Sequence, residues 1–339
     1  MAEPILIWGA GAIGATLGAY WARAGREVLL VDLVAEHVAA CREPGLCIEG
    51  PLESFSLEVD AVTPDELTGR FSKIVLAVKA HRTVAAVTAL HPHLTDDGFV
   101  LSAQNGLNER VIAQRLGERR CMGAFVNFGA DLLEPGRVLF GNRGAVVIGE
   151  LDGRRLARTD AMLELFRLFD RDALLTDNIW GFLWGKLAYG AMLFATALNM
   201  DSMADNFADP ERFPVWRRLG GEVMAVAAAS GVTPMGFDGF APASFAADAP
   251  DSEARKSVAD LASFNRTSAK THSGVWRDLA LLQRRTEVDA QIAVIAELGA
   301  EVGVDTPGIR RLVSLVHDVE DARRPQSLET FAELVAVCS

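Results

Sequence analysis

Cysteine is scarce in this chain of 339 residues. The four cysteines show neither CxxC spacing nor the density of a disulfide-bonded secreted domain, and the N-terminal residues lack the pattern of a signal peptide. His91 and His93 have no further ligands at metal-site spacing. We therefore expect a cytoplasmic protein with neither a disulfide framework nor a metal centre.

Long apolar runs and an excess of basic residues are also missing. The longest apolar stretch, Leu187 to Met200, is shorter than the roughly 20 residues that cross a bilayer, and it begins beside Lys186. Lys and Arg number 33 against 45 Asp and Glu, which gives a net charge of −12. These features predict no membrane span and disfavour nucleic acid or an anionic membrane as the main partner.

The length and a change of pattern along the chain predict two domains. Residues 1–175 alternate short β-branched runs with amphipathic stretches, as in a parallel sheet with crossover helices. Residues 176–339 show helical periodicity, except for Gly236–Pro250, which we expect to form a loop. The expected strands are Pro4–Trp8, Glu27–Val31, Lys73–Val78, Gly98–Ser102 and Ala145–Ile148. The sequence thus predicts an α/β domain followed by an all-α domain, and the apolar, helix-rich second half is compatible with a homodimer.

A glycine motif follows the first expected strand at once. It reads Gly9-Ala10-Gly11-Ala12-Ile13-Gly14 and opens an amphipathic stretch that ends at Gly25. In a Rossmann domain the first glycine permits a tight turn, the second lets a pyrophosphate approach the backbone, and the third lets helix and strand pack closely. We therefore predict that Gly9, Gly11, Ala12, Ile13 and Gly14 bind a dinucleotide, although a purely structural turn remains the alternative.

Asp32 ends the second expected strand. An acidic residue at this distance from the glycine motif accepts hydrogen bonds from the adenosine ribose hydroxyls and repels a 2′-phosphate. The residues that follow, Leu33 to Glu36, supply no arginine for such a phosphate. The pattern favours NAD over NADP, and a solvated aspartate that merely closes a strand is the alternative.

Four later motifs, together with the glycine motif, resemble the ketopantoate reductase family, also called 2-dehydropantoate 2-reductases. They are Ala77-Val78-Lys79-Ala80, Gln104-Asn105-Gly106-Leu107, Leu183-Trp184-Gly185-Lys186-Leu187 and Arg285-Thr286-Glu287-Val288-Asp289. The resemblance runs nearly end to end. It implies a C-terminal domain of the 6-phosphogluconate dehydrogenase-like type, with Lys186 as general acid, Glu287 orienting substrate and nicotinamide ribose, and Asn105 holding both ligands.

The lysine role makes chemical sense in this sequence. Hydride transfer to a carbonyl carbon leaves an alkoxide, which a cationic lysine stabilises and protonates. The apolar neighbours Trp184, Leu187 and Phe194 should bury Lys186 partly and lower its pKa. A lysine that reaches solvent at a domain surface is the alternative.

The other polar candidates have ordinary interpretations beside the functional ones. Lys79 follows a strand end, where it would meet the nicotinamide-side ribose or the phosphates, but surface lysines are common there. Asn105 lies in an Asn-Gly turn, a pair that is frequent because it turns well. Glu287 lies in a charged run, whose default is a solvated helix face. His272 lacks a visible carboxylate partner, which makes it a weak candidate for the catalyst.

Departures from the family pattern concentrate near Lys186. One and two helical turns onward the family has asparagines, where this chain has Gly190 and Phe194. The family's substrate-gripping serine is displaced to Ser273, before Gly274. Asp32 replaces the arginine typical of members that use NADP. Fold and reaction type survive these changes, but they argue against ketopantoate as the substrate.

The departures suggest a larger, more apolar pocket that includes Gly190, Phe194 and Ser273. Three phenylalanines, Phe237, Phe240 and Phe245, would close over its opening, or would only pack their loop onto the domain.

Three functions are compatible with the sequence. The first is an NAD-dependent reductase of a small-molecule 2-oxo acid, or dehydrogenase of a 2-hydroxy acid, with another substrate than ketopantoate. The second is ketopantoate reductase itself, in pantothenate biosynthesis. The third is a dinucleotide-binding sensor without turnover, which the retention of Lys186 and Glu287 disfavours.

Overall fold

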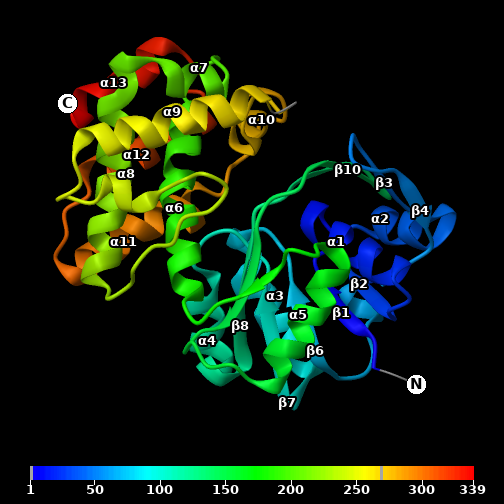
Figure 1. Cartoon of the computed structure of the whole chain (residues 1–339). Helices are drawn as coiled ribbons and strands as arrows, with labels where there is room; N and C mark the ends of the chain where they lie inside the picture. The colour runs from blue at the N-terminus through cyan, green and yellow to red at the C-terminus, as the bar shows by residue number, and fades with distance from the viewer. Residues whose placement is uncertain (1–2, 268–269) are drawn as a thin grey trace. The chain divides into compact units, whose positions relative to one another are not determined.

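The computed structural model describes residues 3–267 and 270–339, which form two compact units, Met1–Ile179 and Trp180–Ser339. The first is an α/β domain and the second is helical, as the sequence predicted (Figure 1).

The first unit is built on an eight-stranded sheet in which most neighbouring strands are parallel. Only β11 runs antiparallel to its neighbour β8 among the described strand pairs of this sheet. In order across the sheet the strands are β12 (Leu174–Leu175), β11 (Val146–Glu150), β8 (Cys121–Val126), β7 (Leu94–Ser102), β6 (Phe71–Leu76), β1 (Ile5–Trp8), β2 (Val28–Val31) and β5 (Asp60–Val62). Because β1 lies between β2 and β6, the strand order reverses at its carboxyl end, where α/β sheets bind their ligands.

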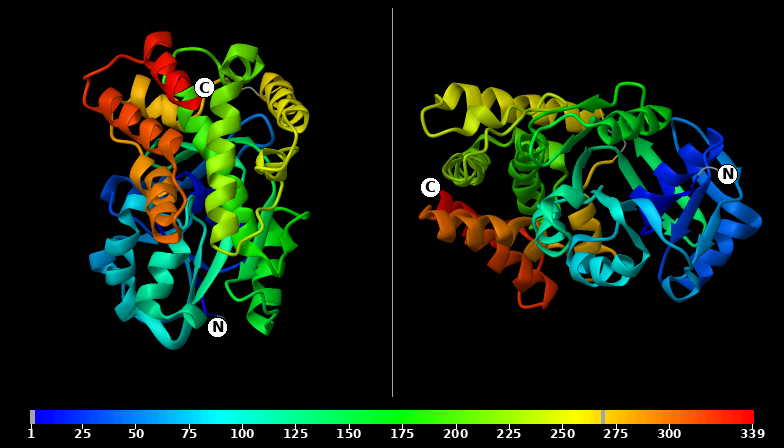
Figure 2. Two further views of the ribbon diagram at one scale, coloured as in Figure 1. Left: turned by 90° about the vertical axis from the view of Figure 1, so that its left-hand side faces the viewer. Right: turned by 90° about the horizontal axis from the view of Figure 1, so that it is seen from below.

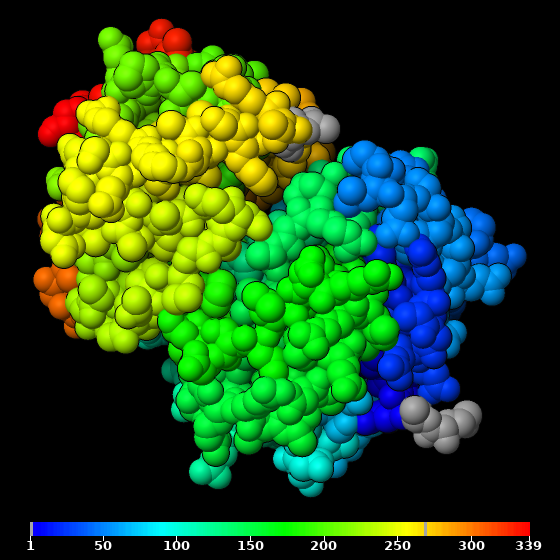
Figure 3. Space-filling view, viewed as in Figure 1, coloured from blue at the N-terminus to red at the C-terminus, as the bar shows by residue number. Residues whose placement is uncertain are grey.

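The five expected strands correspond to β1, β2, β6, β7 and β11, with shifts of a few residues at their ends. Five helices complete the unit: α1 (Ala12–Arg23), α2 (Ala35–Ala40), α3 (Thr83–Leu90), α4 (Asn108–Leu116) and α5 (Ala157–Phe169). Helix α1 packs against α5, with the Trp21 and Phe166 rings 5.4 Å apart. In Figure 3 the green surface around α5 accordingly adjoins the dark blue surface of the N-terminal residues.

A second, four-stranded sheet in this unit was not predicted. Its order is β4 (Phe55–Leu57), β3 (Leu46–Glu49), β10 (Arg137–Asn142) and β9 (Gly129–Glu134). Tyr20 of α1 anchors it, because its ring meets Phe55 and Phe140 edge to face at 5.3 and 5.8 Å. This contact fixes the β9–β10 hairpin to the same helix that the glycine motif opens.

The second unit consists of helices joined by loops in the residues that the structure describes. Its helices are α6 (Ile179–Thr196), α7 (Met203–Ala208), α8 (Phe213–Ala229), α9 (Asp251–Thr267), α10 (Gly274–Ala280), α11 (Val294–Val302), α12 (Pro307–Glu320) and α13 (Leu328–Cys338). The C-terminal helices α11 to α13, orange to red in Figure 2, pack against α8. In residues 3–267 and 270–339, no helix is long and apolar enough to cross a membrane.

The loop phenylalanines pack inward rather than over an opening. Phe237, Phe240 and Phe245 are all buried. The Phe240 ring lies tilted against the Tyr189 ring of α6, with the ring centres 5.6 Å apart. Phe245 lies so close to Gly220 that a β-carbon on Gly220 would approach the Phe245 ring to 2.6 Å. The alternative, packing of the loop onto the domain, is therefore the one observed, and closure over a pocket stays a prediction.

Candidate active site

The glycine turn has the geometry that a pyrophosphate requires. A β-carbon on Gly9, whose φ is +101°, would lie 2.8 Å from the Val78 nitrogen, and one on Gly14 would lie 2.0 Å from the Gly9 oxygen. Around Gly11, by contrast, the described chain leaves the space within 4 Å of that position open. This opening faces the N-terminus of the 12-residue helix α1, so an anion would meet backbone N–H groups and the positive end of the helix dipole.

The Asp32 carboxylate lies against this turn. Its Oδ2 accepts a hydrogen bond from the Ala10 N–H at 2.9 Å, and its Oδ1 accepts one from the Val34 N–H at 3.0 Å. Each oxygen keeps a lone pair for a further donor, and the side chain is only partly buried. Two ribose hydroxyls are donors of the kind that this fixed carboxylate can accept.

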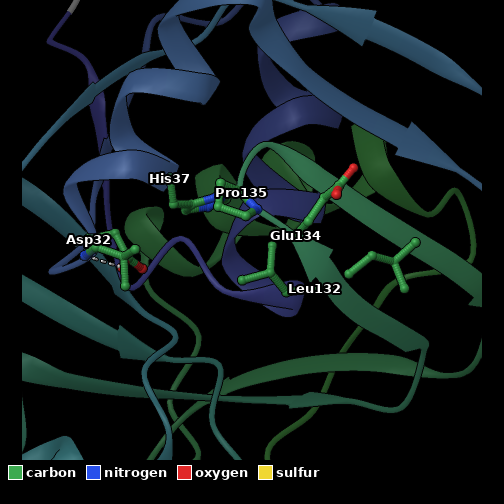
Figure 4. Close-up of a pocket in the computed structure, with 7 residues that line it drawn as sticks. Asp32, His37, Leu132, Glu134 and Pro135 are labelled. Atoms are coloured by element: carbon green, nitrogen blue, oxygen red, sulfur yellow. Dashed lines mark hydrogen bonds between the residues drawn. The ribbon is translucent and has the colours of Figure 1, made fainter.

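A cavity of about 180 Å³ opens beside Asp32 (Figure 4). Val34 and His37 line it from the α2 side, and Leu132 to Pro135, at the tip of the β9–β10 hairpin, line it from the other side. The lining combines apolar side chains with the carboxylates of Asp32 and Glu134, and the Asp32 side suits a base and its ribose. Nothing in the sequence pointed to the hairpin, because it joins the site from about a hundred residues away.

Lys79 and Asn105 come from the carboxyl ends of the two strands on the other side of β1. Lys79 follows β6 directly after Val78, the residue that touches Gly9. Asn105 follows β7, is exposed, and precedes Gly106, whose φ is +99°. The glycine turn, Asp32, Lys79 and Asn105 thus share one edge of the sheet.

A buried amide network that sequence reasoning missed supports this edge. Gln104 Nε2 donates to the Val78 carbonyl and to Thr83 Oγ1, both at 2.8 Å, and Thr83 Oγ1 is 2.8 Å from Asn108 Oδ1. Asn108 Nδ2 in turn donates to the Asn105 carbonyl at 2.6 Å. The network ties the segments after β6 and β7 together.

In the helical unit, Lys186 lies on α6 between Leu183, Trp184 and Leu187, which are all buried. Burial lowers the pKa of Lys186 to about 8, while the carboxylate of Asp238 acts in the opposite direction. The lowered pKa agrees with the expectation from its apolar neighbours. Asp238 was not singled out from the sequence. It lies at the tip of a tight turn whose ends, Phe237 and Phe240, pair through reciprocal hydrogen bonds of 3.1 and 2.8 Å.

Gly190 and Phe194 share the α6 face with Lys186, but their surroundings differ. A β-carbon on Gly190 would meet no described heavy atom within 4 Å, so space is available there. Phe194 is only 2% exposed and belongs to the packed interior of the unit. The open space at Gly190 is compatible with a pocket wall, and the roles of Gly190 and Phe194 as pocket walls both stay predictions.

Glu287 lies on the segment that enters η8 (Asp289–Ala293) and α11. Glu320, at the end of α12, holds this segment: its buried carboxylate accepts bonds from the Thr286 N–H at 2.7 Å, Thr286 Oγ1 at 2.6 Å and an Arg285 nitrogen at 2.9 Å. Burial opposes ionisation, but these bonds and one from His317 hold the pKa of Glu320 below its ordinary value. Glu320 therefore remains an anion that fixes the backbone beside Glu287.

Ser273 has a local structural function. Its hydroxyl caps α10 by accepting a bond from the Trp276 N–H at 3.1 Å, and the residue is buried. The His272 ring lies 4.1 Å from the Trp276 ring and 2.9 Å, through Nδ1, from Thr271 Oγ1. A capping hydroxyl can still donate its own proton to a ligand, so the substrate role of Ser273 stays a prediction.

Two family models match the chain in sequence order. The model described as ketopantoate reductase PanE/ApbA matches residues 5–153, and the model of the C-terminal part of the same family matches residues 178–320. Among curated proteins, a 2-dehydropantoate 2-reductase of Archaeoglobus fulgidus is 29% identical over 94% of this chain and 98% of its own length.

Solved structures share the whole fold. D-mandelate dehydrogenase in complex with NADH and anilino(oxo)acetate gives a TM-score of 0.82 at 24% identity, covering 94% of this chain and 99% of its own. A PanE/ApbA family ketopantoate reductase from Ralstonia eutropha JMP134 gives a TM-score of 0.78 at 26% identity, with the same two coverages.

Proposed function

Because the chain belongs to the ketopantoate reductase family, whose members are NAD(P)-dependent oxidoreductases acting on CH–OH or C=O groups, we propose that it interconverts a 2-oxo acid and its 2-hydroxy acid with NAD(H). The substrate of this proposal is larger and more apolar than ketopantoate. The observation that carries it is Lys186, a partly buried lysine whose pKa of about 8 suits proton transfer near neutral pH.

The residues of the first unit fit a dinucleotide. The open position at Gly11 admits the pyrophosphate, and the Asp32 carboxylate faces the place where a ribose follows it. Gly9, Ala12, Ile13 and Gly14 form the turn around the phosphates, and Lys79 and Asn105 would contact the nicotinamide half. When bound, the cofactor would supply a hydride to the carbonyl carbon of the 2-oxo acid, or accept one from the carbinol carbon of the 2-hydroxy acid.

The chain's own residues handle the charge and the proton. The Lys186 ammonium hydrogen-bonds the carbonyl oxygen, stabilises the negative charge that develops there and delivers a proton to it. In the reverse direction the neutral amine accepts the hydroxyl proton. Glu287, fixed through the Glu320 network, accepts hydrogen bonds from the substrate hydroxyl or the nicotinamide ribose.

Asp32 sets the cofactor preference in this proposal. NADH should bind tighter than NADPH by about one to three orders of magnitude, since a charged hydrogen-bond acceptor contributes up to a few kcal/mol and also repels a 2′-phosphate. Asp32→Ala should reduce this ratio, measured by fluorescence titration with both cofactors. Asp97→Ala removes an equal charge from an exposed site early in β7 and should leave the ratio unchanged. Tighter binding of NADPH by the unmodified protein would refute the assignment.

Gly190 sets the substrate size. With NADH as reductant, 2-oxo acids with bulky apolar or aromatic side chains should exceed ketopantoate in kcat/KM, by about fourfold for each additional buried methylene. Gly190→Asn fills the open space on α6 and should shift the preference toward ketopantoate. Gly221→Asn, on α8 where a side chain also has room, serves as the control and should not shift it.

A protein with the same fold, D-mandelate dehydrogenase, binds anilino(oxo)acetate, which carries an aromatic ring beside its oxoacetate group. This supports an aromatic 2-oxo acid as a substrate. Ketopantoate reductase activity is the second candidate, favoured by the names of curated relatives such as the 29% identical protein of Archaeoglobus fulgidus. If ketopantoate is reduced better than every larger acid in the panel, this second candidate replaces the first.

A further inference from the structure

One buried imidazole connects two parts of the cavity beside Asp32. His37, on α2, is 1% exposed, and both of its ring nitrogens are engaged. Nε2 lies 2.7 Å from the Ala10 carbonyl oxygen, and Nδ1 accepts a hydrogen bond from the Gly136 N–H at 2.9 Å. Because Gly136 can only donate, Nδ1 is the acceptor and Nε2 carries the hydrogen that it donates to Ala10.

The two partners of His37 belong to functionally different segments. Ala10 lies in the glycine turn, and its N–H donates to Asp32 at 2.9 Å. Gly136 lies in the turn of the β9–β10 hairpin, 99 positions from His37 in the sequence. One imidazole therefore sets the spacing between the phosphate-binding turn and the hairpin.

The approach of the hairpin to α2 is close. Gly136 has φ +76°, and a β-carbon there would lie 2.8 Å from the Ala40 β-carbon. A glycine is thus required for the N–H of residue 136 to reach the His37 ring. Figure 4 shows His37 and Pro135 side by side next to Asp32.

The tip of the hairpin presents apolar surface to the cavity. Leu132 is 42% exposed, and Val34, across the cavity, is 52% exposed. Exposed aliphatic side chains that line one cavity beside a carboxylate match a flat base with an attached ribose.

We propose that His37 is a positioning residue, which holds the β9–β10 hairpin against the glycine turn so that Leu132 forms the second wall of the adenosine site. This proposal rests on the dinucleotide binding of the proposed function. Beyond the proposed function, it assigns one wall of the adenosine site to the β9–β10 hairpin of the four-stranded sheet. It also assigns to His37 the distance between that wall and Asp32.

The test measures the binding affinity for ADP-ribose, the part of the cofactor that would occupy this site. His37→Phe keeps a ring of similar size but removes both hydrogen bonds, and should raise the calorimetric Kd for ADP-ribose about 10- to 100-fold. His37→Gln, which retains one donor and one acceptor, should recover most of the affinity. An unchanged Kd for His37→Phe overturns the proposal.

A cofactor without the adenosine half separates positioning from general damage. With reduced nicotinamide mononucleotide, His37→Phe and the unmodified protein should show equal kcat/KM, whereas with NADH the variant should show a raised KM and an unchanged kcat. An equal loss with both cofactors overturns the proposal. Absence of 2-oxo acid reduction by any form, with the ADP-ribose difference intact, would refute only the reductase function.

A surface pair decides the question if His37→Phe does not fold. Leu132→Ser should weaken ADP-ribose binding several-fold, while Leu174→Ser, an exposed leucine on β12 at the opposite edge of the main sheet, should not. Equal affinities of these two variants overturn the proposal.

Discussion

Lys186→Ala should lower kcat for 2-oxo acid reduction by about 10²- to 10⁴-fold while NADH still binds with its normal affinity. In the proposed mechanism the side chain supplies both the charge that stabilises the alkoxide and the proton that neutralises it, so its loss should not affect cofactor binding. Lys256→Ala is the matched control, because Lys256 is exposed on α9 and pairs with Asp260 of the same helix, at 2.6 Å. Stopped-flow single turnovers and NADH titrations separate the two effects.

The pH dependence of the unmodified enzyme gives an independent readout. Burial lowers the pKa of Lys186 to about 8, so the ammonium form predominates at neutral pH. For reduction the ammonium is required, and kcat should fall about tenfold per pH unit above that pKa. For oxidation the neutral amine is required, and kcat should rise through the same range. A Lys186→Ala enzyme within a few-fold of the normal kcat would exclude Lys186 as the acid and return attention to His272.

The nucleotide half of the fold could be predicted because its signals are local. A β-branched run, three spaced glycines and a following amphipathic stretch lie within 25 residues, and an aspartate ends the next strand. The first and third of those glycines are required by close contacts with Val78 and Gly9, and the second borders open space. Each of the three glycines therefore has the structural role that the spacing of the motif predicted.

The four-stranded sheet could not be predicted in the same way. Its strands β3 and β10 pair across about ninety residues, and strand pairing at that distance leaves no periodic signal in either segment. The same reason hid His37 and the hairpin wall. Strand β8 was missed for a different reason: its first four residues, Cys-Met-Gly-Ala, are neither β-branched nor aromatic, so they give no strand signal.

The supporting residues of the helical unit were also invisible in the sequence. In the sequence, Glu320 lies among other charged residues and Asp238 lies in a segment typical of a turn, so neither is conspicuous. Only the folded chain brings Glu320 to Thr286 and Asp238 near Lys186. The loop phenylalanines illustrate the converse, because aromatic residues in a Gly- and Pro-rich segment suggested a lid but pack into the domain. Apolar side chains in a loop often pack the loop onto its domain and need not contact a ligand.

The buried Glu109 carboxyl group makes the stability of the first unit depend on pH. Glu109 lies on α4 with no exposed surface, and burial outweighs the hydrogen bonds from Ser102 and from its own backbone that favour its carboxylate form. Burial raises its pKa to about 8. The folded state therefore keeps a proton that the unfolded chain, with an ordinary glutamate pKa near 4.5, releases.

This difference fixes the sign of the effect. Between pH 4.5 and 8 the folded state binds more protons than the unfolded state, so the free energy of unfolding falls as the pH rises through that window, by about 5 kcal/mol in total. Glu109→Gln removes the ionisation and should abolish this contribution. The buried amide of the variant also changes the free energy of unfolding, but by an amount that does not depend on pH. The test therefore compares how the free energy of unfolding varies with pH, not its absolute value.

Amide hydrogen exchange of peptides from α4 and β8, at pH 5, 7 and 9 after correction for intrinsic rates, should show Glu109→Gln gaining protection relative to the unmodified protein as the pH rises. Glu118→Gln changes an exposed carboxyl group immediately after α4 and should show no such gain. A difference between Glu109→Gln and the unmodified protein that stays constant from pH 5 to 9 would mean that the carboxyl group ionises normally in the folded state. In that case the hydrogen bonds from Ser102 and the Glu109 backbone would outweigh the cost of burying the charge.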